Sequence, residues 1–72
     1  MSIDVSVSIR VNGEQRRVPE GISVAEMLKT IGLDPTKVAV ERNLEIVPRS
    51  ALSEVRIAGG DAYEIVHFVG GG

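Results

Sequence analysis

The chain has 72 residues, 43% of them apolar, and a net charge of −2 from 8 basic and 10 acidic side chains. This length predicts one domain with a modest core, because small domains bury a smaller share of their surface than large ones. The absence of cysteine excludes a disulfide framework, a thiolate metal site and a cysteine nucleophile. A single histidine likewise excludes a histidine-based metal cluster within one chain.

The charge and the hydropathy pattern also limit the partners. A small negative net charge argues against nucleic-acid binding. No apolar run approaches the roughly 20 residues that a membrane-spanning helix needs, and the first residues do not resemble a signal peptide. We therefore expect a soluble cytoplasmic protein that binds neither nucleic acid nor membrane.

Residues 3–11 alternate between apolar and polar side chains, a period of two that is typical of a half-buried strand. Asn12-Gly13 follows and predicts a tight hairpin turn, because both positions of such a turn favour positive φ. The returning strand over residues 14–18 is polar and carries two adjacent arginines, which suit it to the edge of a sheet. We therefore expect a β-hairpin over residues 3–18.

A single main helix is expected over residues 24–31. Ser23 and Glu26 fit a capping box, in which each side chain accepts a hydrogen bond from the backbone N–H of the other residue. Gly32 supplies a left-handed stop. Four apolar side chains at helical spacing form one stripe, which we interpret as core because a small sheet needs a cover: Val24, Met27, Leu28 and Ile31.

Three further strands are expected after the helix. Residues 37–42 and 45–47 predict two strands joined by a turn at Asn43, and residues 63–69 predict the last strand. The first strand and the last strand both suit the centre of a sheet, so we expect them side by side and parallel. The predicted fold is an α+β domain over residues 1–69, a mixed sheet of four to five strands with one main helix packed on one face.

The last strand is apolar on both faces. Tyr63 and Ile65 share one face, whereas Val66 and Phe68 share the other. Because one helix covers only one face of a sheet, we expect Val66 and Phe68 to lie away from the helix and to contact a partner protein. The alternative is that loops of the chain cover this face.

Three glycines, Gly70, Gly71 and Gly72, follow the last strand. Glycine has no Cβ and loses much conformational freedom on ordering, so residues 70–72 predict a thin, flexible tail that could thread a narrow channel. The alternative is a frayed terminus without function. Elsewhere the chain has no plausible Ser–His–Asp partnership and no phosphate-binding glycine motif, so we expect neither an enzyme nor a bound cofactor or metal.

The order of elements, ending in a strand and glycines, resembles the β-grasp ubiquitin-like carriers. More narrowly, the chain resembles the ThiS family, the sulfur carriers of bacterial thiamine (thiazole) biosynthesis. The likeness covers nearly the whole chain and departs from the family only in the first four residues and at Gly70, where some members carry alanine. It depends on four stretches: Val38-Ala39-Val40-Glu41-Arg42-Asn43, Ile46-Val47-Pro48-Arg49, Gly60-Asp61, and Glu64-Ile65-Val66-His67-Phe68-Val69-Gly70-Gly71-Gly72.

This resemblance implies that a ubiquitin-activating-like adenylyltransferase, which uses ATP and magnesium, adenylates the carboxylate of Gly72. A persulfide sulfur from a cysteine desulfurase or an equivalent donor then displaces AMP and leaves a thiocarboxylate. Thiazole synthase takes the sulfur from it. Gly70 and Gly71 would form the thread that enters the partner's site, and Val66 and Phe68 would belong to the docking face.

Three other functions remain open at this point. The small subunit of molybdopterin synthase has the same fold and thiocarboxylate chemistry, although Ile46-Val47-Pro48-Arg49 favours the thiamine role. A ubiquitin-like protein modifier would instead join Gly72 to a lysine through an isopeptide bond. An inert β-grasp binding module would not need its glycines.

Overall fold

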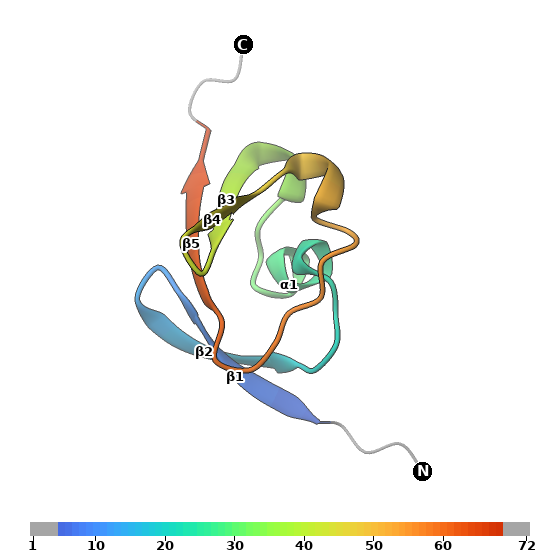
Figure 1. Cartoon of the computed structure of the whole chain (residues 1–72), viewed down its shortest axis with the longest axis vertical. Coiled ribbons are helices and arrows are strands. Elements are labelled where there is room, and N and C mark those ends of the chain that lie inside the picture. Colours follow the sequence, from blue (N-terminus) through green and yellow to red (C-terminus); the bar gives the residue numbers. More distant parts are fainter. Residues whose placement is uncertain (1–4, 69–72) are drawn as a thin grey trace.

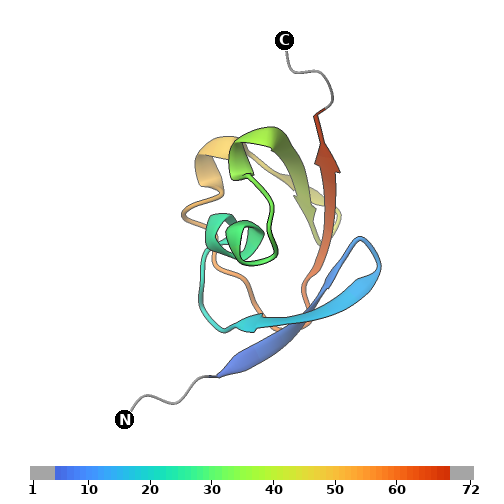
Figure 2. The ribbon, with the colours of Figure 1, turned by 180° about the vertical axis from the view of Figure 1, so that it is seen from behind.

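The computed structural model describes residues 5–68. Over these residues, five strands form one mixed sheet, and α1 (Val24–Thr30) packs across one face of it (Figure 1; Figure 2). Two single-turn 3₁₀ helices, η1 (Pro35–Lys37) and η2 (Arg49–Ala51), lie in the connections. This architecture confirms the predicted α+β class. The strands are β1 (Ser6–Val11), β2 (Glu14–Pro19), β3 (Val38–Arg42), β4 (Glu45–Val47) and β5 (Ala62–His67).

The strand order is β2-β1-β5-β3-β4, with β2 and β4 at the edges. β1 and β5 lie side by side and parallel, with Arg10 opposite Ala62 and Val11 opposite Tyr63. β2 pairs antiparallel with β1, and β3 pairs antiparallel with both β4 and β5. The predicted parallel pairing of the first and last strands inside the sheet is therefore confirmed, as is the edge position of β2.

The capping box predicted for α1 is present. The Ser23 Oγ accepts from the Glu26 N–H at 3.0 Å, and the Glu26 carboxylate accepts from the Ser23 N–H at 2.9 Å. At the other end, the Gly32 N–H donates to the Lys29 carbonyl at 3.0 Å and the Leu33 N–H donates to the Leu28 carbonyl at 2.8 Å. These two bonds form a Schellman motif, which is possible because Gly32 adopts a φ of 90°.

This motif ends α1 at Thr30, one residue earlier than predicted. Val24, Met27 and Leu28 are fully buried, as the apolar stripe predicts. Ile31 is only half-buried, because it occupies the C-cap position, where the chain leaves the helix. The expected stripe is thus correct for three of its four members.

Several predicted strand boundaries are wrong by one or two residues. β3 begins at Val38 rather than at residue 37, because Asp34 caps the η1 turn by accepting from the Thr36 N–H at 2.9 Å. β5 begins at Ala62 and ends at His67, since its register with β3 ends where Val38 lies opposite His67. The last strand therefore ends two residues earlier than predicted, and β2 ends at Pro19, one residue later than predicted. The predicted start of the first strand at residue 3 and the domain boundary after residue 69 lie outside the described residues.

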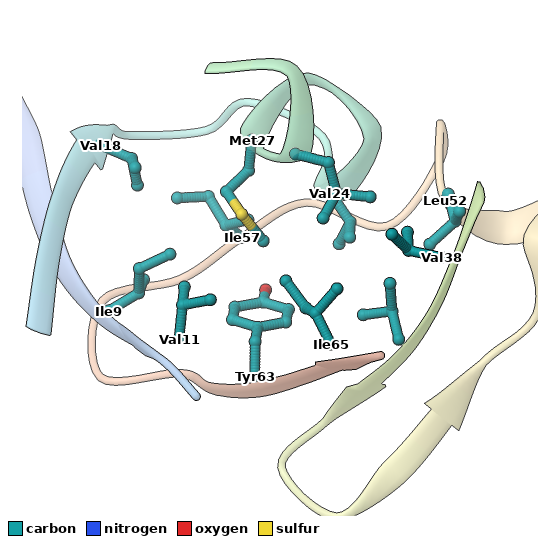
Figure 3. Packing of buried hydrophobic residues seen from close by; sticks show 12 residues of the cluster. Ile9, Val11, Val18, Val24, Met27, Val38, Leu52, Ile57, Tyr63 and Ile65 are labelled. Carbon is teal, nitrogen blue, oxygen red and sulfur yellow. The ribbon is translucent and has the colours of Figure 1, made fainter. Parts of the chain in front are cut away.

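The core lies between α1 and the sheet. In Figure 3, Tyr63 and Ile65 point from β5 toward side chains of α1, and Ile9 and Val11 reach the same space from β1. β-Branched residues make up most of this core, and the sequence holds only two aromatic residues, Tyr63 and Phe68. Its members are Ile9, Val11, Val18, Val24, Met27, Leu28, Val38, Val40, Leu52, Ile57, Tyr63 and Ile65.

Truncating Leu28 tests the packing of α1. We expect Leu28→Ala to lower the free energy of unfolding by about 2–5 kcal/mol, because the side chain is fully buried and its loss leaves a cavity. Urea denaturation measures the change. The matched control is Lys29→Ala on the exposed side of the same helix, for which about 0.5 kcal/mol or less is expected. A Leu28→Ala curve that overlays the wild-type curve would contradict the placement of α1.

Candidate functional site

The residues predicted to carry function fall into two groups. Gly70, Gly71 and Gly72 lie outside residues 5–68, so the predicted tail stays a prediction. Val66 and Phe68 lie within the described chain, one on β5 and the other directly after it. The structure therefore shows where the predicted docking residues are placed.

Val66 and Phe68 lie on the exposed side of β5. Their exposed fractions are 63% and 53%, whereas Tyr63 and Ile65 are 1% and 7% exposed. Successive side chains of a strand point to opposite faces. Because Tyr63 and Ile65 face the core, Val66 and Phe68 face the opposite, exposed side. The predicted facing of β5 is confirmed, and loops within residues 5–68 do not cover Val66 or Phe68. Contact with a partner at these two residues stays a prediction.

Neighbouring strands extend this exposed apolar surface. Ala39 on β3 lies directly opposite Val66, and Ile46 on β4 is 76% exposed. We call Ala39, Ile46, Val66 and Phe68 the outer patch. The sequence analysis assigned no docking role to Ala39 or Ile46, because β4 is too short for its alternation to show which side chain faces outward. Only the register between the strands shows that Ala39 lies opposite Val66 and that Ile46, opposite Glu41, lies on the same outer face.

Arg49 adds a positive charge to the rim of the outer patch. Its guanidinium carbon lies 5.7 Å from the centroid of the Phe68 ring, within the range of a cation–π contact. Arg49 belongs to η2, which follows β4, and Phe68 follows β5. The sequence singles out Arg49 as part of a family motif, but nothing in the sequence shows that it lies over Phe68.

Asp61 fixes the start of β5 from inside the fold. This buried carboxylate accepts four hydrogen bonds, from the Ala58 N–H at 2.8 Å, the Tyr63 hydroxyl at 2.9 Å, the Arg42 Nε at 3.0 Å and the Asn43 Nδ2 at 3.1 Å. It thereby joins the loop before β5 to the end of β3 and to the turn after β3. Gly60-Asp61 and Asn43, two parts of the family motif, thus meet at one structural centre.

The charged state of this cluster is stabilised by the same bonds. Burial alone would raise the pKa of Asp61, but the hydrogen bonds from Ala58, Asn43, Arg42 and Tyr63 outweigh it and lower that pKa below its ordinary value. The hydrogen bond to Asp61 in turn raises the pKa of Arg42. Burial and the same carboxylate raise the pKa of the Tyr63 hydroxyl. The carboxylate therefore stays ionised in the folded protein.

Asn12 continues the pairing of β1 with β5 after the backbone of β1 turns away. Its side-chain oxygen accepts from the Ile65 N–H at 2.7 Å, and its side-chain nitrogen donates to the Ile65 carbonyl at 3.1 Å. The amide group thus takes the place of a backbone peptide. Together with Asp61, it holds β5 at two points along the strand that leads toward Phe68.

Two further kinds of feature are absent from the described residues. Within residues 5–68, no three side chains of the histidine, aspartate or glutamate type gather closely enough to hold a metal ion. Over the same range, the structure contains no helix with the length and apolar character that crossing a membrane requires. The candidate docking site is the exposed apolar face of β5, and the buried Asp61 cluster holds this strand in place.

This fold defines the class of the protein. A five-stranded mixed sheet, with parallel first and last strands and one helix across it, is the ubiquitin-like β-grasp architecture. It matches the crystal structure of a thiamine biosynthesis protein, ThiS, from Geobacter metallireducens with a TM-score of 0.77 and 33% identity, over 92% of this chain and 100% of that chain. The family model of the ThiS family matches residues 9–72. The chain belongs to the ThiS family.

The curated relatives include a sulfur carrier protein and two thiazole synthases. A sulfur carrier protein ThiS from Bacillus subtilis is 42% identical over 69% of this chain and 76% of its own length. A thiazole synthase from Paramagnetospirillum magneticum is 50% identical over 86% of this chain, and one from Magnetococcus marinus is 39% identical over 92%. The chain spans only 19% and 20% of the length of these two synthases.

Proposed function

We propose that this chain is a sulfur carrier protein of thiamine biosynthesis that holds sulfur on the carboxylate of Gly72. The observation that supports this most strongly is the ThiS family match, which runs from β1 through all three terminal glycines. The names of the Bacillus subtilis and Geobacter metallireducens relatives point in the same direction. In this role, the chain is a substrate and carrier for other enzymes rather than an enzyme.

The proposed chemistry begins with the carboxylate of Gly72, which is a poor electrophile until it is activated. A partner adenylyltransferase, binding ATP and Mg²⁺, joins the Gly72 carboxylate to AMP and releases pyrophosphate. The terminal sulfur of a persulfide on a sulfur donor, a cysteine desulfurase or its equivalent, attacks the acyl carbon, and AMP leaves. A further thiol cleaves the resulting acyl disulfide and is itself oxidised to a disulfide, which leaves the thiocarboxylate. Since the chain has no cysteine, both sulfur nucleophiles come from partners.

The second proposed partner is a thiazole synthase, which receives the sulfur. Two relatives that carry a segment similar to nearly all of this chain are named thiazole synthase. The similar segment makes up about a fifth of each of those proteins, so a carrier-like segment and a synthase occur together in one polypeptide. This co-occurrence supports a direct association between the present chain and a synthase.

Formation of the adenylate tests the proposal. A purified adenylyltransferase of this pathway is expected to catalyse ATP–pyrophosphate exchange when the chain is added, and to show background exchange without it. Exchange that does not rise on addition of the chain would contradict the proposed function. An unrelated β-grasp domain with a Gly-Gly end serves as the control for non-specific stimulation.

Truncating Phe68 tests the docking role of the outer patch. We expect Phe68→Ala to weaken binding to the adenylyltransferase by about tenfold or more, because exposed aromatic side chains at an interface often contribute over 1.4 kcal/mol. Its melting temperature should stay close to the wild-type value, since the ring is 53% exposed. Titration calorimetry and a thermal melt measure the two quantities. Leu44→Ala, at an 89% exposed position outside the outer patch, is the matched control.

A further inference from the structure

The exposed face of the sheet divides into two halves of different character. On the β1–β2 half, the outward side chains bond to one another: Gln15 donates to Ser8 at 2.7 Å, and Arg17 donates to Ser6 at 2.9 Å. These polar groups are satisfied within the chain. These four side chains therefore need no partner, whereas Arg10, also outward on β1, forms no ion pair within residues 5–68.

The β5–β3–β4 half carries two carboxylates directly opposite each other. In the register of β3 with β5, Glu41 pairs with Glu64, and both lie on the face that carries Ala39 and Val66. Directly opposite side chains have Cβ atoms about 4.5–5.5 Å apart, and like charges at that spacing destabilise the sheet. This pair is an unfavourable arrangement near the middle of the exposed face.

No basic side chain within residues 5–68 forms an ion pair with Glu41 or Glu64 at 4.0 Å or less. Arg42 lies next to Glu41 in sequence, but its guanidinium binds Asp61 on the inner side. Arg49 lies over the Phe68 ring. Arg10 lies on the same face, opposite Ala62 and one outward position from Glu64, but it forms no ion pair with Glu64 at 4.0 Å or less. The two carboxylates thus have no ion-pair partner within the described residues, and the register places apolar residues of the outer patch beside them.

The apolar neighbours are in register with the carboxylates. Ile46 lies directly opposite Glu41 on β4, and Val66 follows Glu64 at the next outward position of β5. If a partner protein placed a cationic side chain between the two carboxylates, apolar side chains of the partner beside that cation would contact the outer patch. Charge-assisted hydrogen bonds to one guanidinium can satisfy two carboxylates together.

We infer that the β5–β3–β4 half of the exposed face is the docking surface for the thiazole synthase, and that the synthase places one arginine or lysine side chain between Glu41 and Glu64, beside an apolar contact with the outer patch. This inference rests on the proposed function, from which the synthase is taken as the partner. The carboxylate pair supplies charge complementarity and disfavours partners that present an acidic side chain there. The β1–β2 half, where Gln15 and Arg17 bond to Ser8 and Ser6, lies outside the footprint.

This arrangement predicts opposite effects on the free chain and on the complex. Neutralising one carboxylate removes the repulsion within the chain, so Glu41→Gln and Glu64→Gln should each keep or raise the melting temperature. The same substitutions remove a charged partner of the synthase side chain, so each should weaken binding about tenfold or more. A purely structural role of the pair would not separate stability from binding in this way.

The experiment is titration calorimetry of the chain against a purified thiazole synthase that has no carrier-like segment of its own, at two salt concentrations. We expect wild-type binding to weaken with salt, and the binding of Glu41→Gln and Glu64→Gln to be weaker and less sensitive to salt. Glu20→Gln, at an exposed turn position after β2, is the matched control and should bind as the wild type does.

Two results would overturn the inference. If the wild type binds and both glutamine variants bind equally well, the docking surface is wrong, although the proposed function stands. If the glutamine variants lose stability together with binding, the carboxylate pair supports the fold rather than the interface. A wild type that does not bind the synthase at all contradicts the proposed partnership itself, and the inference with it.

Discussion

Asp61→Asn is expected to lower the free energy of unfolding by about 3 kcal/mol, because it removes the buried member of a partly buried ion pair. The carboxylate accepts four hydrogen bonds, and an amide in its place brings an N–H₂ group toward the same donors. Whole domains are stable by only about 5–15 kcal/mol, so the variant should be close to unfolding at 37 °C.

Urea denaturation of Asp61→Asn measures this loss. The matched control is Asp34→Asn, which changes an exposed carboxylate that caps the η1 turn and should have a much smaller effect. Equal losses for the two variants would show that the buried cluster does not hold β5 as described.

The Asp61 carboxylate also predicts that the folded protein loses stability at acidic pH. The pKa of Asp61 is lower in the folded protein than its ordinary value, so the unfolded chain binds its proton first as the pH falls. The stabilisation is complete above the ordinary aspartate pKa of about 3.9 and is lost as the pH falls below it. Urea midpoints between neutral pH and pH 2 should fall in the wild type and change less in Asp61→Asn. Parallel pH profiles would contradict the assignment.

Gly71→Val is expected to abolish thiocarboxylate formation while the domain folds normally. If the tail threads a narrow channel, a β-branched side chain widens it without changing its length, and small misplacements of a reacting group can reduce the rate about 100-fold. Deletion of Gly72 shortens the reach of the tail by about 3.3–3.6 Å. This variant should also form no thiocarboxylate, because its terminal carboxylate stops short of the reaction site. Both variants should bind the adenylyltransferase with modest loss.

Intact mass after reaction with the adenylyltransferase, ATP–Mg²⁺ and a sulfur donor measures thiocarboxylate formation in both tail variants. Ser2→Val, a β-branched substitution at the other end of the chain, is the control and should react as the wild type does. Full conversion of Gly71→Val would show that the glycines are not needed for passage through a narrow channel.

Local patterns predict much of this fold because local physics determines those parts. Period-two alternation predicts which face of β1 is buried, and the Ser23–Glu26 capping box places the start of α1. Asn43 lies at the predicted turn and adopts a positive φ of 52°. Leu44, beside it, also adopts a positive φ, of 71°. The two-residue connection between β3 and β4 requires positive φ at both positions, which overrides the preference of leucine. The preference of leucine alone therefore does not reveal this requirement of the hairpin.

The site is less predictable than the fold because its contacts join residues far apart in the chain. The Asp61 cluster brings together β3, its following turn and the loop before β5, and the Asn12 amide bonds to Ile65 across the sheet. The Arg49–Phe68 contact and the Glu41–Glu64 pair depend on the register of β3 with β5. A single sequence does not give the register between paired strands, so these contacts are seen only in the structure.

The most direct test of the carrier role is to locate sulfur on the chain itself. The wild type is incubated with the adenylyltransferase, ATP–Mg²⁺ and a persulfide donor, and the intact protein and its C-terminal peptide are then weighed by mass spectrometry. We predict a gain equal to the replacement of one oxygen by one sulfur, located at Gly72 and absent without ATP. An unchanged mass in the complete reaction, or sulfur located anywhere other than Gly72, would contradict the proposed function.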